Sequence, residues 1–189
     1  ILGPNITDWP QMPPMSRHLL VQLAAVLHDS VTTTDELIPS GETSSYRSDP
    51  LKLASFALSR RDPDYVPRAR ATQALEETRR SGAMPPELQS VQKSLSIPDM
   101  GRVQIGSVLF ANKPGDGSAR EQAASCQRVL GGCANLCYEF ATKRYRSNCV
   151  NWGMLPFTLA EGTDFPGHPG DFLYVPQVRE KVTLSLLHI

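Results

Sequence analysis

The chain has 189 residues, and its 19 basic and 19 acidic side chains give a formal net charge of zero. This length allows one domain with a core of its own. The sequence lacks the basic patch or stripe that nucleic-acid binding requires, so we expect no nucleic-acid partner. No apolar run approaches the roughly 20 residues of a membrane-spanning helix, so we expect no membrane partner either.

The four cysteines lie close together in the chain, at Cys126, Cys133, Cys137 and Cys149. They form no CxxC pair and no histidine lies nearby, a spacing that does not favour a metal site. Free cysteines commonly serve as small buried apolar groups, and reduced thiols are typical of the cytoplasm. We therefore expect structural thiols, no metal on this chain and a cytoplasmic location.

Patterns of strand and helix alternate along the first half of the chain. Residues 1–16 carry four prolines and predict an extended arm or interdomain linker, with the domain itself over 17–189. Residues 18–28 have the length and composition of a buried strand, although a short helix also fits. A loop with a threonine-rich β-edge follows over 29–41. Helices are predicted over 50–61 and 67–82, whereas 88–98 has no regular pattern.

The second half continues the alternation. Residues 102–111 predict a strand that leads directly into a glycine turn, and 118–132 predict a helix closed by two glycines. A strand over 133–141, a short helix over 142–153 and a strand over 154–159 follow. The tail, 170–189, predicts two strands separated by a turn that contains proline. The alternation indicates an α/β domain built in layers.

The most unusual stretch is "GDGSAREQAA", residues 115–124, where a glycine turn delivers a serine and an arginine to the start of a helix. Glycines allow positive φ angles and a close approach to the backbone. A helix N-terminus together with Arg120 would form a carboxylate or phosphate site, with the Ser118 hydroxyl beside the bound anion. Alternatively, Ser118 caps the helix and Arg120 is a solvated charge. The local pattern alone favours the helix-cap interpretation.

Two other serine and phosphate motifs do not fit this stretch. A P-loop needs a lysine after its second glycine, and none follows Gly117. A nucleophile elbow needs glycines two residues before and after the serine, where this chain has Asp116 and Arg120. These departures exclude the common P-loop and serine-hydrolase signatures.

Two blocks of sequence carry a further set of motifs. The first block runs over 115–159 and contains, in order, Gly117-Ser118-Ala119-Arg120-Glu121, Leu130-Gly131, Phe140-Ala141, Asn148 and Gly153-Met154-Leu155-Pro156. The second is "TTTDELIPSG" with "YRSDPL", over 32–41 and 46–51. The first block resembles the C-terminal swivel domain of the aconitase superfamily of hydro-lyases in order and spacing, and the second is similar to that family's T-T-D-H-I stretch and arginine loop. The resemblance covers most of 19–159 and implies an α/β domain with three layers, β/β/α.

The resemblance also implies roles for single residues. Ser118 would be the catalytic base that removes a proton α to a carboxylate, and the Arg47 and Arg120 side chains would hold substrate carboxylates. Gly117 and Ala119 would line the same substrate site, and Asp35 would support the Arg47 loop. A loop aspartate that bonds to nearby backbone is the alternative for Asp35. The helix dipole and the arginines would together stabilise the negative charge of the Ser118 alkoxide and so help to activate the serine.

Two departures from the family pattern mark this chain as a divergent member. Ala119 stands where the family has a second serine, and a hydroxyl contact to a charged group is worth about 1.5–3 kcal/mol. Glu36 stands where the family has a histidine. The resemblance therefore implies a hydroxy di- or tricarboxylic acid as substrate without indicating which one.

The family's [4Fe-4S] cluster is held by other domains, and the four cysteines here do not match its ligands. The resemblance implies that the partners are cluster-bearing domains of the same chain or a large subunit, and that this chain is inactive alone. The proline-rich arm and the first residue, which is not Met, favour a piece of a longer chain. The alternatives are a non-catalytic binding domain on the same scaffold and a stand-alone anion-binding protein.

Overall fold

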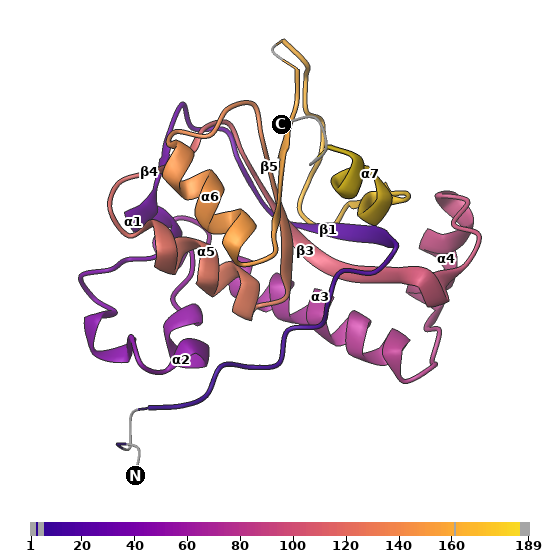
Figure 1. Ribbon diagram of the computed structural model, residues 1–189, viewed down its shortest axis with the longest axis horizontal. Coiled ribbons are helices and arrows are strands. Elements are labelled where there is room, and N and C mark those ends of the chain that lie inside the picture. Colours follow the sequence, from indigo (N-terminus) through magenta and orange to yellow (C-terminus); the bar gives the residue numbers. More distant parts are fainter. Residues whose placement is uncertain (1–2, 4–5, 161, 186–189) are drawn as a thin grey trace.

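A mixed five-stranded sheet forms the centre of the protein in the computed structural model, which describes residue 3 and residues 6–160 and 162–185 (Figure 1). The strand order is β6-β5-β3-β1-β7. Four strands run parallel, and β7 is antiparallel to β1. The strands are β1 (His18–Leu27), β3 (Val103–Ala111), β5 (Gly132–Cys137), β6 (Leu155–Thr158) and β7 (Phe172–Val175).

The central strands β1 and β3 are apolar because both of their faces are covered. All of β3 is buried, and its register with β1 places Leu20 beside Ile105. Such near-continuous apolar runs are typical of parallel strands covered on both faces. The strand predictions over 18–28 and 102–111 are thereby confirmed.

Helices lie on both faces of the sheet. On one face, Leu109 packs in a cluster with Ala69 of α3 (Tyr65–Arg80) and Ala123 of α5 (Arg120–Val129). On the other, Val108 packs with Val178 of α7 (Val178–Ser185). Neighbouring residues of a strand point to opposite faces, so the core has two separate layers. Figure 1 shows α3 and α7 on opposite sides of β1 and β3.

The first helix after the arginine loop is shorter than predicted. α2 spans Pro50–Ala54, with the proline in its first turn as expected, but it does not continue to residue 61. Leu58 has φ of 55°, which a right-handed helix cannot contain, and its N–H donates to the Leu37 carbonyl at 3.0 Å. Tertiary packing of a fully buried leucine thus ends the helical pattern early.

Two further element predictions were wrong. Residues 88–98 are not irregular, because α4 spans Pro86–Ser94 and buries Leu88 against the sheet. The tail forms one strand, β7, and then the helix α7 in place of a second strand. Val178 and Val182 are four residues apart and pack on the same cluster, a helical spacing. The last four residues of the predicted strand, 186–189, lie outside the described residues.

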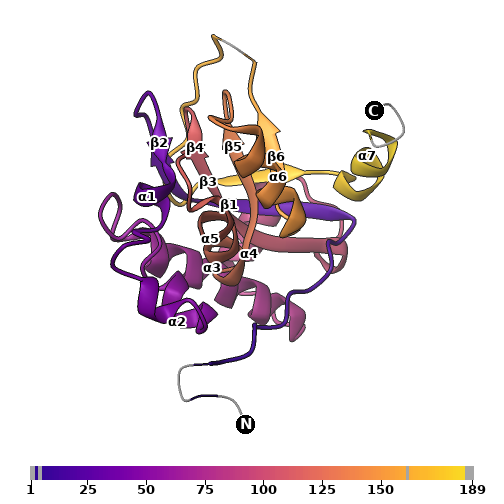
Figure 2. The same cartoon turned by 60° about the vertical axis from the view of Figure 1, so that its left-hand side comes forward.

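A small second sheet joins the two sequence blocks that carry the resemblance. Strand β2 (Thr32–Thr33) pairs in parallel with β4 (Pro114–Asp116), so the threonine-rich loop lies beside the glycine turn. Figure 2 shows both short strands next to α1 (Thr34–Leu37). Segments more than 80 residues apart in the sequence therefore meet in space, and β4 leads directly to α5.

The described part of the arm contains no helix or strand, but it contacts the domain. Arg128 donates to the Pro13 carbonyl at 3.1 Å, and the rings of Trp9 and Trp152 lie 4.7 Å apart. Trp152 directly follows α6 (Lys143–Asn151). Among the described residues, no helix has the length and apolar character needed to cross a bilayer.

Candidate active site

The glycine turn is fixed by packing that excludes any side chain. Gly115 has φ of 97°, and a Cβ there would lie 2.2 Å from Cδ1 of Tyr145. Gly117 has φ of 125°, and its Cβ would lie 2.3 Å from Oγ1 of Thr34. Both positions therefore need glycine for conformation and for space. Because Tyr145 and Thr34 are themselves buried, the turn is held rigidly against two other elements.

Ser118 does not cap the helix. The N-cap of α5 is Ala119, which makes no side-chain cap hydrogen bond, and the helix begins at Arg120. Ser118 precedes the cap and is exposed. The alternative of Ser118 as an ordinary helix cap is therefore wrong, and its hydroxyl faces solvent beside the first turn of the helix.

Ser118 and Arg120 line one hollow, which has a volume of about 400 Å³ and is open to solvent. Arg120 donates to the carbonyl of Gly117, a contact that holds its side chain back against the turn. Three cations and one carboxylate are among the lining residues. The complete lining is Ser118, Arg120, Glu121, Lys143, Arg144, Ser147 and Asn148.

Glu121 supplies the one carboxylate among the described residues that line this hollow, and it accepts hydrogen bonds from two neutral donors. The Trp152 indole N–H donates to Oε1 of Glu121 at 2.5 Å, and the Asn148 amide donates to Oε2. Neither partner carries charge, so Glu121 is fixed in place without neutralising a lysine or arginine. The hollow therefore keeps a net positive character that suits an anion.

The second wall of the hollow is the first turn of α6, which is tied to the glycine turn. The Thr142 hydroxyl donates to the Gly115 carbonyl at 3.0 Å and accepts from the Tyr145 N–H at 3.2 Å. The Ala141 N–H donates to the Pro114 carbonyl at 2.9 Å. Lys143 and Arg144 are thus carried on the same rigid unit as Ser118.

A closed polar triangle anchors α6 in the core. The Tyr145 hydroxyl donates to Oδ1 of Asn135 at 2.9 Å and accepts from Nε2 of Gln127 at 2.8 Å. The Asn135 amide donates back to Oε1 of Gln127 at 2.9 Å. All three side chains are buried, and burial raises the pKa of Tyr145 well above its ordinary value. The triangle connects α6, β5 and α5 beneath the hollow.

Arg47 lies outside this hollow. It is exposed at the end of a 3-10 turn, Ser44–Tyr46, and is not among the lining residues of the hollow. Its loop connects α1 with α2, and both of these helices contact α5. The structure therefore joins Ser118 and Arg120 in one hollow and holds the Arg47 loop against the same helix, while a shared site for all three stays a prediction.

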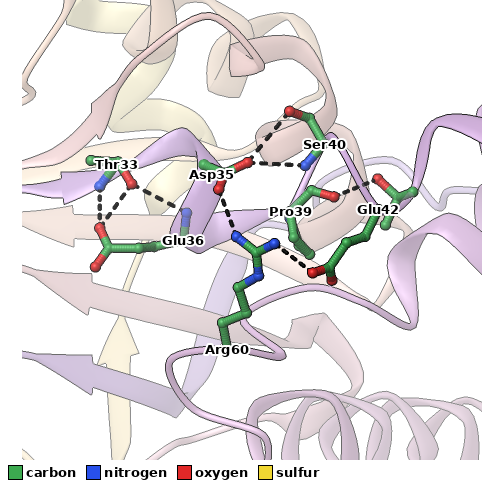
Figure 3. A network of polar contacts seen from close by, with 8 residues as sticks. Thr33, Asp35, Glu36, Pro39, Ser40, Glu42 and Arg60 are labelled. Carbon is green, nitrogen blue, oxygen red and sulfur yellow. Dashed lines mark hydrogen bonds and ion pairs between the residues drawn. The ribbon is translucent and has the colours of Figure 1, made fainter.

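Asp35 belongs to an ion-pair network that involves a different arginine (Figure 3). Its carboxylate accepts from Arg60 at 2.9 Å and from the backbone N–H of Ser40 at 3.2 Å. Arg60 also pairs with Glu42 at 2.5 Å. Asp35 thus braces the loop that precedes Arg47 through Arg60 and the backbone, and the described contacts include none between Asp35 and Arg47.

Glu36, which replaces the family's histidine, completes a capping box at α1. Its carboxylate accepts from the Thr33 N–H at 2.7 Å, and the Thr33 hydroxyl accepts from the Glu36 N–H at 3.2 Å (Figure 3). The sequence carries the usual signal for this motif, a threonine followed three residues later by a glutamate. The side chain therefore has a structural role in starting α1.

The cysteines do not form a metal centre within the described residues, where no group of three or more metal-ligand side chains is found. All four thiols are free and buried. Burial raises the pKa of Cys126 and Cys149 to about 12 and that of Cys133 to about 11, so these thiols stay protonated at neutral pH.

Sequence reasoning missed Lys143 and Arg144 as residues of the hollow. The available signal was a basic pair directly after a threonine that could cap a helix, in a segment already predicted as helical. What the sequence did not show is the contact between the start of this helix and the glycine turn, because that contact spans 27 residues between Gly115 and Thr142.

Comparisons with known proteins agree with this architecture. Residues 89–162 match the family model of the aconitase C-terminal domain. Aconitate hydratase A from Bradyrhizobium diazoefficiens is 42% identical over 84 residues, which are 43% of this chain and 8% of that protein. The chain thus spans less than a tenth of this curated relative. Ser118 and Arg120 lie within the matched family range, whereas Arg47 lies before it.

A solved structure extends the likeness in fold. The 3-isopropylmalate dehydratase of Methanocaldococcus jannaschii matches with a TM-score of 0.50 and 20% identity, covering 83% of this chain and 70% of that one. This match confirms the expected α/β domain of the three-layer aconitase type. Residues 89–162 are thus similar in sequence to the aconitase C-terminal domain, and the likeness in fold extends over most of the chain.

Proposed function

We propose that this domain forms part of a hydro-lyase that dehydrates and rehydrates a hydroxy di- or tricarboxylic acid. Ser118 would be its base, and Arg120 and Arg47 would hold substrate carboxylates, with Gly117 and Ala119 as further contacts. The observation that carries the proposal is the position of Ser118. It does not cap α5, it is exposed, and it shares a cationic hollow with Arg120.

The chemistry follows from that position. The Ser118 alkoxide takes a proton from the carbon α to a carboxylate, and the C–H electron pair forms the double bond. The hydroxyl on the neighbouring carbon leaves as water with a proton that an acid on another part of the enzyme would donate. A serine hydroxyl holds its proton tightly, so the alkoxide form that acts as the base needs electrostatic stabilisation. Arg120 and the first turn of α5 supply positive charge beside it.

The rest of the enzyme would supply what this domain lacks. A [4Fe-4S] cluster on other domains or on a large subunit would act as the Lewis acid for the leaving hydroxyl, and we place no part of it on this chain. The domain alone would then be inactive, and the buried reduced thiols are in keeping with a cytoplasmic location.

The proposal is tested by Ser118→Ala in the complete cluster-containing enzyme. We expect the turnover number to fall by about a thousandfold or more, with substrate affinity changed only slightly, because the base acts in the transition state. The control is Ser90→Ala, since Ser90 is exposed on α4, which lies at the right-hand edge of Figure 1, away from α5 near the centre. Unchanged turnover in Ser118→Ala would overturn the base role and favour a non-catalytic binding domain.

A further inference from the structure

The two basic residues at the start of α6 have no assigned role. Lys143 and Arg144 are exposed and line the same hollow as Ser118 and Arg120. Within the described residues, no acidic group lies within ion-pair distance of Lys143, Arg144 or Arg120. The three positive charges on this wall repel one another, and a bound anion would reduce this repulsion.

We propose that Lys143 and Arg144 bind a second carboxylate of the substrate, remote from the one held by Arg120, and so select a tricarboxylate. The inference rests on the proposed function, in which Arg120 holds one carboxylate beside the Ser118 base. The hollow, at about 400 Å³, has the size of a small-molecule site. Lysine and arginine together give a carboxylate several charged donors.

The rigid connection to the glycine turn makes this pair suitable for recognition. The Thr142 hydroxyl joins the start of α6 to Gly115, and Tyr145 of the same turn packs against that glycine. A substrate that bridges Arg120 and Lys143 would therefore meet two walls whose separation is fixed before binding. Preorganisation of this kind lowers the entropic cost of binding a flexible acid.

The acids named for the two relatives differ in the groups that this wall of the hollow would contact. Aconitate carries three carboxylates, whereas 3-isopropylmalate carries two carboxylates and a branched hydrocarbon group. The described lining of the hollow contains no aliphatic or aromatic side chain that would pack against an isopropyl group. Cations at this position therefore favour the tricarboxylate over the branched dicarboxylate.

Arg146 provides a matched control on the same helix. It is also an exposed cation, but it lines a separate apolar groove together with Met154 and Phe157. Replacing it removes one positive charge from α6, half of what the double variant removes, without altering the lining of the hollow. A general loss of positive charge is thereby separated from the loss of a specific contact.

The experiment compares Lys143→Gln/Arg144→Gln with Arg146→Gln and with wild type in the complete enzyme, using cis-aconitate and 3-isopropylmalate as alternative substrates. Binding of tricarballylate and glutarate to this chain is measured by calorimetry in parallel, so that one readout does not depend on turnover. We expect the double variant to weaken tricarballylate binding and to raise KM for cis-aconitate by about tenfold to a hundredfold. We expect turnover to be retained, and Arg146→Gln to behave as wild type.

Three outcomes would overturn the inference. One is unchanged tricarballylate binding and KM in the double variant, while Ser118→Ala still abolishes turnover; the proposed function then survives alone. Another is an equal loss of binding with Arg146→Gln, which would indicate only bulk charge. The third is weakened assembly with the cluster-bearing part of the enzyme at unchanged tricarballylate affinity, which would make the pair a docking surface. If Ser118→Ala retains turnover, the proposed function fails, and the calorimetry alone then decides whether this wall binds tricarboxylates.

Discussion

The loop before the Arg47 turn and the hollow at Ser118 are both rich in charge, but they use it differently. In the loop, Arg60 bridges Asp35 and Glu42, and Glu36 caps α1 (Figure 3). In the hollow, the cations of α5 and α6 have no acidic partner among the described side chains. Its glutamate instead accepts from an indole and an amide.

The difference shows how the two regions are stabilised. The loop is braced by exposed ion pairs, which contribute little to stability and are screened by salt. The hollow is stabilised by packing at the glycines and by the buried triangle of Tyr145, Asn135 and Gln127. Its cations are therefore not needed for ion pairs within the domain and can bind a ligand. Substitutions in the two regions should therefore distinguish charges that stabilise the fold from charges that bind a ligand.

Filling the space at Gly115 should have the largest effect. In Gly115→Ala the new methyl would overlap the buried Tyr145 ring at a positive φ angle, and we expect a loss of about 3–5 kcal/mol in the free energy of unfolding. Urea denaturation measures the loss. Gly153→Ala is the control, because Gly153 has φ of 72° but nothing within 4 Å of a Cβ, so only about 1 kcal/mol should be lost. Equal losses in both variants would mean that packing against Tyr145 does not hold the turn.

Removing one hydroxyl from the buried triangle should have an intermediate effect. Tyr145→Phe leaves the Gln127 donor and the Asn135 acceptor each without one partner in the core, at a cost of about 1–3 kcal/mol. Thermal or urea unfolding measures it. Tyr138→Phe is a suitable comparison, because the Tyr138 hydroxyl donates to the Thr163 carbonyl in an exposed position and should matter less. Identical stabilities for the two variants would contradict the anchoring role of the triangle.

Much of this architecture could be predicted from the sequence. The buried strands β1 and β3, the helix α3 closed before Gly82, and the strand–turn–helix that carries Ser118 all follow from local composition and glycine placement. The errors fall where tertiary packing decides the conformation. α4 forms because Leu88 is buried against the sheet, and α7 forms because Val178 and Val182 pack on its other face.

The candidate site was predictable only in its local part. Ser118 and Arg120 are two residues apart, so a single helix start places them together. The participation of Lys143 depends on a hydrogen bond between Thr142 and Gly115 that no local pattern specifies. The partner of Asp35 is likewise set by tertiary structure, because Arg60 lies 25 residues away and was not among the predicted site residues.

The smallest effect is expected from breaking the ion pairs of the loop. In Arg60→Gln the carboxylates of Asp35 and Glu42 lose their shared cation, but both are exposed and regain full hydration. The urea midpoint should therefore fall only slightly at low ionic strength, and the difference from wild type should vanish in 1 M salt because screening already weakens the pairs. Substrate affinity of the complete enzyme should change only slightly, since this network does not line the hollow and braces the Arg47 loop only through exposed ion pairs. A salt-insensitive loss as large as that of Tyr145→Phe would show that the loop depends on its charges as strongly as the hollow depends on its packing.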